Sequence, residues 1–71
     1  MENLNMENNN RYVHFKNVNG FKEMRYACHN IDQAVFIASD IYRNHRPHDI
    51  EYLYITRYDN DNIERVVKNY I

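Results

Sequence analysis

The dipeptide Asn19-Gly20 is the feature that most constrains how this chain can fold. A two-residue type I′ hairpin turn needs positive φ at both central positions, which asparagine and glycine tolerate better than other residues. Counting outward from such a turn places Lys16 opposite Glu23 and Val13 opposite Tyr26. One face of the pair is then apolar and the other polar, as expected for a sheet with one buried face. We therefore predict an antiparallel hairpin centred on this dipeptide.

The segment after the predicted hairpin has the pattern of an amphipathic helix. Asn30 is a suitable N-cap residue, and Gln33 follows it at capping-box spacing. A helix that begins here would run to about Asn44. At about 100° per residue, the apolar side chains that share one face are Ile31, Ala34, Val35, Ala38, Ile41 and Tyr42. Phe36 would point to solvent, with Ile37 at the border between the two faces.

The last part of the chain predicts one more strand and one more helix. Residues 49–58 alternate, with Leu53 and Ile55 on one face and Tyr52 and Tyr54 on the other. Alternation then breaks, and helical spacing connects the apolar residues Ile63, Val66, Val67, Tyr70 and Ile71. We therefore expect a terminal helix over residues 63–71 in preference to a fourth strand.

The predicted element order is ββαβα. A right-handed crossover would place the third strand beside the first and both helices on the same side of the sheet. The expected fold is an α/β (α+β) two-layer sandwich, in which a three-stranded sheet carries two helices on one face. The other sheet face would have no helix over it.

Length and composition limit the possible functions. A chain of 71 residues makes one small domain, expected over residues 11–71 after a disordered, Asn-rich tail at residues 1–10. A core of this size leaves little room for a catalytic cavity, and pairing of two copies is a common remedy for a small core. The formal net charge of -1 argues against a general nucleic-acid-binding protein. We expect a cytoplasmic homodimer without a membrane segment.

Catalytic and metal-binding patterns are weak in this sequence. Cys28 and four histidines could supply metal ligands. The histidines are His14, His29, His45 and His48. Paired cysteine motifs, which usually build a structural zinc site, are absent from the sequence. Ser39 falls within the predicted helix without the glycines of a nucleophile elbow. We expect neither an enzyme nor a bound cofactor or metal.

Acidic residues are concentrated between positions 49 and 64. They are Asp49, Glu51, Asp59, Asp61 and Glu64, and Asp40 could join them from the helix. Carboxylates on alternate residues of a strand lie about 6.6 Å apart, a spacing similar to that of phosphates along a nucleic-acid strand. The functional hypothesis is that these acids bind a basic, DNA-binding protein. The alternative is that they are a solvated face and participate in turns and capping.

Aromatic residues form a second candidate surface. Tyr12, Tyr52 and Tyr54 would share the uncovered sheet face with His14 and Arg25. This face could stack nucleic-acid bases, or it could contact a partner protein or a second copy. A third hypothesis uses Phe36 and Ile37 on the helix to dock onto a host defence or proteolytic factor.

The Asn-rich start, the abundance of tyrosine and the lack of a catalytic pattern resemble the small early host-takeover proteins of lytic bacteriophages. Among these, the segregated acids are similar to DNA-mimic inhibitors, in particular inhibitors of the nucleoid protein HU. The resemblance implies an inhibitor that occupies the DNA-binding cleft of HU in the host cytoplasm. It covers the whole chain and involves no specific motif.

Overall fold

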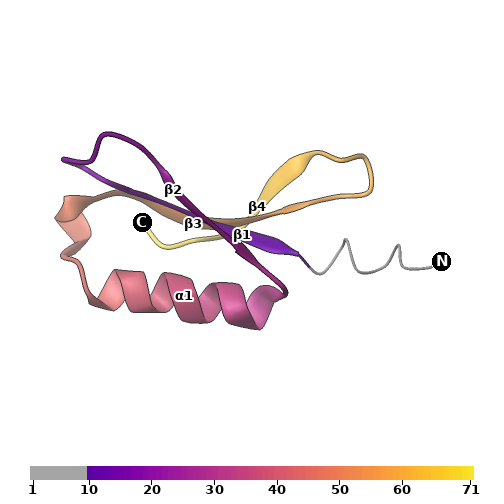
Figure 1. Cartoon of the computed structure of the whole chain (residues 1–71), viewed down its shortest axis with the longest axis horizontal. Coiled ribbons are helices and arrows are strands. Elements are labelled where there is room, and N and C mark those ends of the chain that lie inside the picture. Colours follow the sequence, from indigo (N-terminus) through magenta and orange to yellow (C-terminus); the bar gives the residue numbers. More distant parts are fainter. Residues whose placement is uncertain (1–9) are drawn as a thin grey trace.

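A computed structural model describes residues 10–71, so the predicted tail lies, apart from Asn10, outside the described residues. In this part of the chain the element order is ββαββ, with a turn of 3-10 helix before the third strand (Figure 1). The bounds are β1 Arg11–Asn17, β2 Met24–Cys28, α1 Ile31–Arg43, the 3-10 helix Pro47–Asp49, β3 Ile50–Tyr58 and β4 Glu64–Asn69. The α+β class is as predicted. The order ββαβα and the three-stranded sheet with two helices are wrong.

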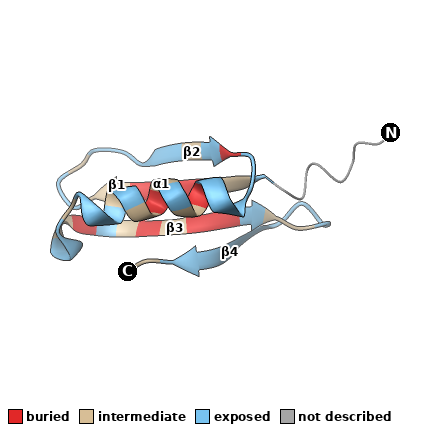
Figure 2. Cartoon of the chain, turned by 90° about the horizontal axis from the view of Figure 1, so that it is seen from below, coloured by how far each residue is buried: buried red, intermediate tan, exposed pale blue. Residues whose placement is uncertain are grey.

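The four strands form one antiparallel sheet in the order β2-β1-β3-β4. The third strand lies beside the first, as the crossover rule predicts. Helix α1 covers one face of this sheet, and the opposite face carries no helix from residues 10–71 (Figures 1 and 2). The fold therefore has one apolar layer between helix and sheet, and one open sheet surface.

The β1–β2 hairpin has the predicted register but not the predicted turn. Val13 pairs with Tyr26, and β1 ends at Asn17. Gly20 does not have positive φ, and its N–H donates to the carbonyl oxygen of Asn17 at 2.9 Å. The two-residue type I′ turn is therefore replaced by a longer connection. The backbone N–H of Val18 is held by a bond to the carbonyl oxygen of Asp49 at 2.9 Å, which a local sequence pattern cannot predict.

The start of helix α1 confirms the predicted cap. The side chain of Asn30 accepts a hydrogen bond from the backbone N–H of Gln33 at 2.9 Å, which satisfies one of the free donors at the helix start. The Gln33 side chain accepts in turn from the backbone N–H of His29 at 2.7 Å. The helix ends at Arg43, one residue before the predicted limit, and Phe36 is exposed as expected.

The core lies between α1 and the sheet. Its buried apolar residues are Val13, Phe15, Cys28, Ala34, Ala38, Ile50, Leu53 and Ile55. Ala34 and Ala38 are fully buried, and their small side chains let the helix axis approach the strands closely. Figure 2 shows the buried residues gathered on α1 and the two central strands, while β4 is exposed.

The segment predicted as a terminal helix is strand β4. It pairs with β3, but the register shifts between Thr56, opposite Val66, and Ile55, opposite Lys68. Val67 is therefore the extra residue of a β-bulge. This bulge is the physical reason that strand alternation breaks at Val66-Val67, which made the sequence resemble a helix.

Candidate functional site

The sheet face that α1 leaves uncovered gathers aromatic and charged side chains from all four strands and the loop before β2. We call it the open face. It consists of Tyr12, His14, Lys16, Glu23, Arg25, Tyr52, Tyr54, Thr56, Tyr58 and Glu64, which the strand alternation and their mutual contacts place together.

His14 lies at the centre of the open face and is only 5% exposed. Its Nδ1 lies 2.9 Å from a carboxylate oxygen of Glu23. Its Nε2 lies 2.9 Å from both the hydroxyl oxygen of Thr56 and a carboxylate oxygen of Glu64. The Thr56 hydroxyl donates to the same Glu64 oxygen at 2.6 Å. The imidazole therefore connects the loop before β2 with β3 and with the edge strand β4.

Each ring nitrogen of His14 faces a carboxylate, which limits how the ring can form hydrogen bonds. An ionised carboxylate only accepts hydrogen bonds, so both contacts are hydrogen bonds when the ring carries a proton on each nitrogen. In that form His14 pairs with two anions, and all three charged groups are satisfied.

The two carboxylates respond to this arrangement. The hydrogen bond from Thr56 is the main influence that lowers the pKa of Glu64, and the nearby charge of His14 adds to it against the opposing effect of burial. Burial alone would raise the pKa of Glu23, but hydrogen bonds from Tyr52 and His14 outweigh it and lower the pKa. Both glutamates are therefore held in their ionised form.

The tyrosines of the open face are packed against one another and against basic groups. The rings of His14 and Tyr54 are stacked with centroids 4.8 Å apart. The Arg25 guanidinium lies 4.5 Å from the centre of the Tyr12 ring. Tyr52 donates to Glu23 at 2.7 Å, and this bond raises the pKa of Tyr52 to about 12. The phenol is therefore a fixed neutral donor.

The sequence placed part of the open face correctly. Its five predicted members, Tyr12, His14, Arg25, Tyr52 and Tyr54, do lie together. Thr56 and Tyr58 were missed, although they continue the alternation of Tyr52 and Tyr54. The predicted hairpin register placed Glu23 opposite Lys16, but the Lys16 ammonium forms its ion pair with Glu51 at 2.6 Å. The role of Glu23 depends on a loop conformation that has no local sequence signature.

The predicted acidic surface is divided between the two ends of β3. Asp49 precedes the strand and Asp59 follows it, so about ten residues of extended chain, roughly 33 Å, separate them. Most of these acids also have partners within the chain. Glu51 pairs with Lys16, Asp59 with Arg65, Glu64 with His14, and Asp40 with Arg43 on the helix.

Two of the predicted acids have only a weak ion pair or none within residues 10–71. Asp49 lies 3.8 Å from the exposed ring of His48, which is a weak contact, and Asp61 is exposed without an ion pair to any residue in the range 10–71. Asp59 instead organises the β3–β4 turn, because its carboxylate accepts from the backbone N–H groups of Asp61 and Ile63. The capping role proposed for Asp61 and Glu64 is absent because no helix follows them.

The two helix residues predicted to contact a partner differ in their exposure. Phe36 is 70% exposed on α1, whereas Ile37 is half-buried and packs against the core. Both lie on the helical layer, on the opposite side of the sheet from the open face. Phe36 and the tyrosines therefore cannot form one continuous surface.

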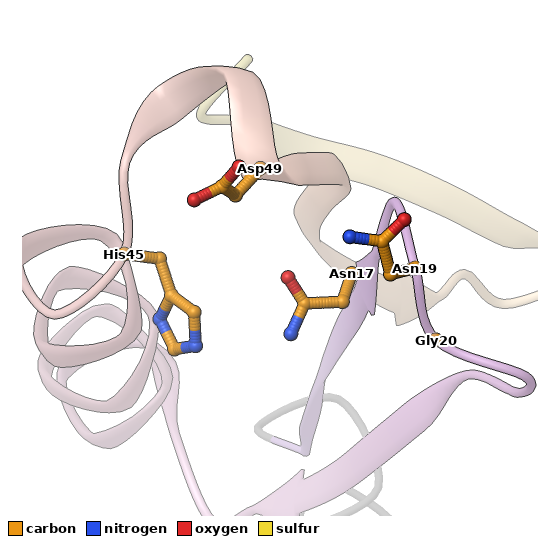
Figure 3. A pocket seen from close by; sticks show the side chains of 5 residues that line it. All are labelled: Asn17, Asn19, Gly20, His45 and Asp49. Carbon is orange, nitrogen blue, oxygen red and sulfur yellow. The ribbon is translucent and has the colours of Figure 1, made fainter.

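A concave site, separate from the open face, lies at the end of the sheet near the C-terminal end of α1. Figure 3 shows this hollow, which we call the end pocket; its volume is about 380 Å³. It is lined by Asn17, Asn19, Gly20, His45 and Asp49. The sequence had indicated His45 and Asp49 separately, the first as a metal ligand and the second as an acid. The loop connections bring them together.

The remaining candidates for catalysis or metal binding, Cys28 and the histidine and acidic side chains, lie in unfavourable surroundings for these roles. Cys28 is buried, and burial raises the pKa of its thiol, which disfavours the reactive thiolate. Both ring nitrogens of His14 are engaged by carboxylates or a hydroxyl, so neither is free to exchange a proton with a substrate. Across residues 10–71, histidine, cysteine and acidic side chains form no group of three placed to hold a metal ion.

Comparisons of this chain with protein-family models, with curated proteins and with solved structures find no match. Within the described residues, no helix is both long and apolar enough to cross a membrane.

Proposed function

We propose that this chain is a non-enzymatic protein-binding domain whose contact surface is the open face of the sheet. The observation that carries the proposal is the gathering of Tyr12, Tyr52, Tyr54 and Tyr58 with Arg25 on a sheet face that no helix of residues 10–71 covers. Tyrosine and arginine are enriched at protein interfaces because they combine apolar area with polar groups. Their mutual contacts also hold these side chains in place before binding, which lowers the entropic cost of association.

The charges of the open face favour a protein partner over a nucleic acid. Glu23 and Glu64 flank His14 at the centre of the face, and their lowered pKa values keep them negative. A phosphate backbone laid across this surface would meet these carboxylates. A protein can match acidic and basic groups in alternation, whereas the uniform charge of a nucleic-acid strand cannot.

A basic, DNA-binding host protein such as HU stays the proposed partner for the acidic residues. What supports it is the position of Asp49 and Asp61 near opposite ends of β3, where neither carboxylate has a strong partner among residues 10–71. The internal pairing of Glu51, Asp59 and Glu64 reduces their capacity to imitate phosphates. If DNA mimicry operates, it depends chiefly on the two less engaged acids. Pairing of two copies through the open face also stays a prediction.

The test is capture of partners from a nuclease-treated bacterial lysate, with HU measured directly as one candidate. We expect a Tyr12→Ala, Tyr52→Ala double variant to reduce partner binding about tenfold or more, since aromatic residues at interface centres contribute strongly. Phe36→Ala removes an exposed aromatic from the helical layer and is the matched control. Equal binding by the double variant and by wild type would reject the open face as the contact surface.

The role of charge is tested separately. Asp49→Asn and Asp61→Asn should weaken binding to HU, and the affinity of wild type should fall as salt rises. Binding to HU that is insensitive both to salt and to these substitutions would exclude DNA mimicry while leaving the open-face proposal intact. A mobility shift with single-stranded DNA or RNA that tyrosine substitution abolishes would favour a nucleic-acid partner instead.

A further inference from the structure

The end pocket combines polar side chains from three separate parts of the chain. Asn17 ends β1, Asn19 follows in the loop, His45 lies just beyond α1, and Asp49 ends the 3-10 helix. Figure 3 shows the side chains of His45, Asp49 and Asn17 directed toward the same hollow. Neither asparagine side chain has a hydrogen bond to another residue in the range 10–71, so both amides are available to a ligand.

The orientation of His45 is set by its neighbours. Its Nδ1 lies 2.8 Å from the carbonyl oxygen of Ile41, and a carbonyl only accepts, so Nδ1 carries the proton. The imidazole also packs against Phe15, with ring centroids 5.0 Å apart. In neutral His45, Nε2 is then left as a hydrogen-bond acceptor. The hydrogen bond from Nδ1 to Ile41 therefore fixes the tautomer and leaves Nε2 for a ligand.

The lining of the end pocket favours a cation that can donate several hydrogen bonds. Its acceptors are the Asp49 carboxylate, Nε2 of His45 and the amide oxygen of Asn17, and Asn19 completes the lining (Figure 3). Lysine and arginine are both absent from the residues that line it. The pocket also lies beyond the C-terminal end of α1, where the helix dipole adds a partial negative charge. An anion would face Asp49 with no lining cation to compensate.

A metal ion fits this lining less well than an organic cation does. His45 and Asp49 are the two strong metal ligands among the lining residues, fewer than a stable site normally uses. A guanidinium presents five donors in a planar fork, which matches a carboxylate with further acceptors around it. The volume of about 380 Å³ accommodates such a group together with water.

From the convergence of Asp49, His45, Asn17 and Asn19 on one hollow, we infer that the end pocket binds a guanidinium cation, with the Asp49 carboxylate as its principal anchor. The cation can belong to a small free molecule or to an arginine side chain of a bound protein. This inference does not rest on the open face, which Asp49 does not join.

The test is a titration of the isotopically labelled chain followed by NMR, with two cationic probes. Methylguanidinium represents the free cation, and a capped Gly-Arg-Gly peptide represents an arginine within a chain. We expect saturable shifts, centred on the amides of Asn17, Asn19 and Gly20 and on the His45 ring, at millimolar probe. Similar affinities would indicate that the guanidinium alone is recognised, and tighter binding of the peptide would indicate an arginine side chain in a partner.

Matched controls separate this site from general charge attraction. Methylurea has nearly the shape of methylguanidinium without its charge, and it should not produce the shifts. Asp49→Asn should weaken binding about tenfold, since charge-assisted hydrogen bonds are lost. Asp61→Asn makes the same change of charge at an exposed acid far from the end pocket, and it should leave the affinity within about twofold of wild type.

Two further observations make the outcome decisive. Within the described part of the chain the Asp49 side chain forms no hydrogen bond, and its backbone makes the contacts to Arg46 and Val18, so the variant should stay folded. His45→Phe keeps a ring beside Phe15 and removes the acceptor, and it should also weaken binding. The inference is overturned if neither cationic probe gives saturable shifts, if Asp49→Asn and Asp61→Asn behave alike, or if methylurea binds equally well.

Discussion

His14 shows how a single residue can hold both edges of a small sheet. Its ring is almost fully buried, yet it contacts Glu23 on the loop that leads to β2 and Glu64 on β4. A buried charge is costly unless it is paired and hydrogen-bonded, and here two carboxylates and one hydroxyl supply that pairing. The stability of this group therefore depends on all of its members at once.

Removal of the imidazole should destabilise the fold. We expect His14→Leu to lower the free energy of unfolding by about 1–3 kcal/mol, because hydrogen bonds to charged groups are lost and two glutamates are left without their cation. Urea denaturation followed by circular dichroism measures the change. His29→Gln replaces an exposed histidine and is the control. Equal stability of the two variants would show that the His14 contacts contribute nothing to stability.

The same group predicts a loss of stability in acid. The folded chain lowers the pKa of both Glu23 and Glu64, so the unfolded chain takes up protons at higher pH than the folded one. Their stabilising contribution is complete above the unfolded value of about 4.3 and is lost as pH falls through the lower folded values. Stability should therefore rise with pH across this acidic window.

The contribution of one carboxylate can be isolated. Glu64→Gln cannot ionise, so the melting temperature of this variant should fall less steeply than that of wild type between neutral pH and pH about 3. Asp61→Asn removes an exposed acid that has no ion pair within residues 10–71, and it should retain the wild-type slope. Parallel pH profiles for wild type and Glu64→Gln would contradict the assigned role of Glu64.

At the level of elements, the turn between β3 and β4 contains the one non-glycine residue with positive φ within residues 10–71. This is Asn62, with φ of 64°. Asparagine tolerates the left-handed region better than residues with other side chains. For those residues this conformation costs roughly 1 kcal/mol or more. The turn that needs a special residue is therefore this one, and not the Asn19-Gly20 turn that the sequence indicated.

Substitutions in this turn test the assignment. Asn62→Ala should lower the free energy of unfolding by about 1 kcal/mol, while Asn62→Gly should be close to wild type. Asn60→Ala, in the same exposed turn but without positive φ, serves as the comparison. Chemical denaturation of the three variants measures the differences. A neutral Asn62→Ala would mean that the turn does not require the left-handed conformation.

The elements that the sequence predicted are those determined by local chemistry and by a buried face. The N-cap at Asn30 is a local hydrogen bond, and the register of β1 and β2 follows from the burial of alternate residues on one side. Strand β4 lacks both sources of information, since all of its residues are exposed and a bulge at Val67 changes the phase of alternation. Its pairing is a long-range property that the local pattern contradicts.

At the scale of the whole molecule, the sequence grouped the acidic residues correctly by position along the chain but not in space. Strand β3 separates Asp49 from Asp59, and internal bases neutralise most of the others. The tyrosines were easier to predict because strand alternation alone places them on one face. Contacts such as His14 with Glu23, and the convergence at the end pocket, require loop conformations that no short motif specifies.

The fold as a whole depends on one small core. A substitution in this core is therefore expected to lower the free energy of unfolding more than any other substitution considered. Leu53 is fully buried between α1 and the sheet, so Leu53→Ala should lower the free energy of unfolding by about 2–5 kcal/mol. A domain of 71 residues has a total of only about 4–10 kcal/mol, so the variant should be partly unfolded at physiological temperature.

Thermal melting and the dispersion of proton NMR signals measure this effect, with Val66→Ala as the control. Val66 is 57% exposed on β4, and its truncation should change the free energy of unfolding by less than about 0.5 kcal/mol. A loss below about 1 kcal/mol for Leu53→Ala would mean that the core is not the main source of stability. In that case a second copy on the open face would have to supply the missing burial, and the melting temperature of wild type would rise with protein concentration.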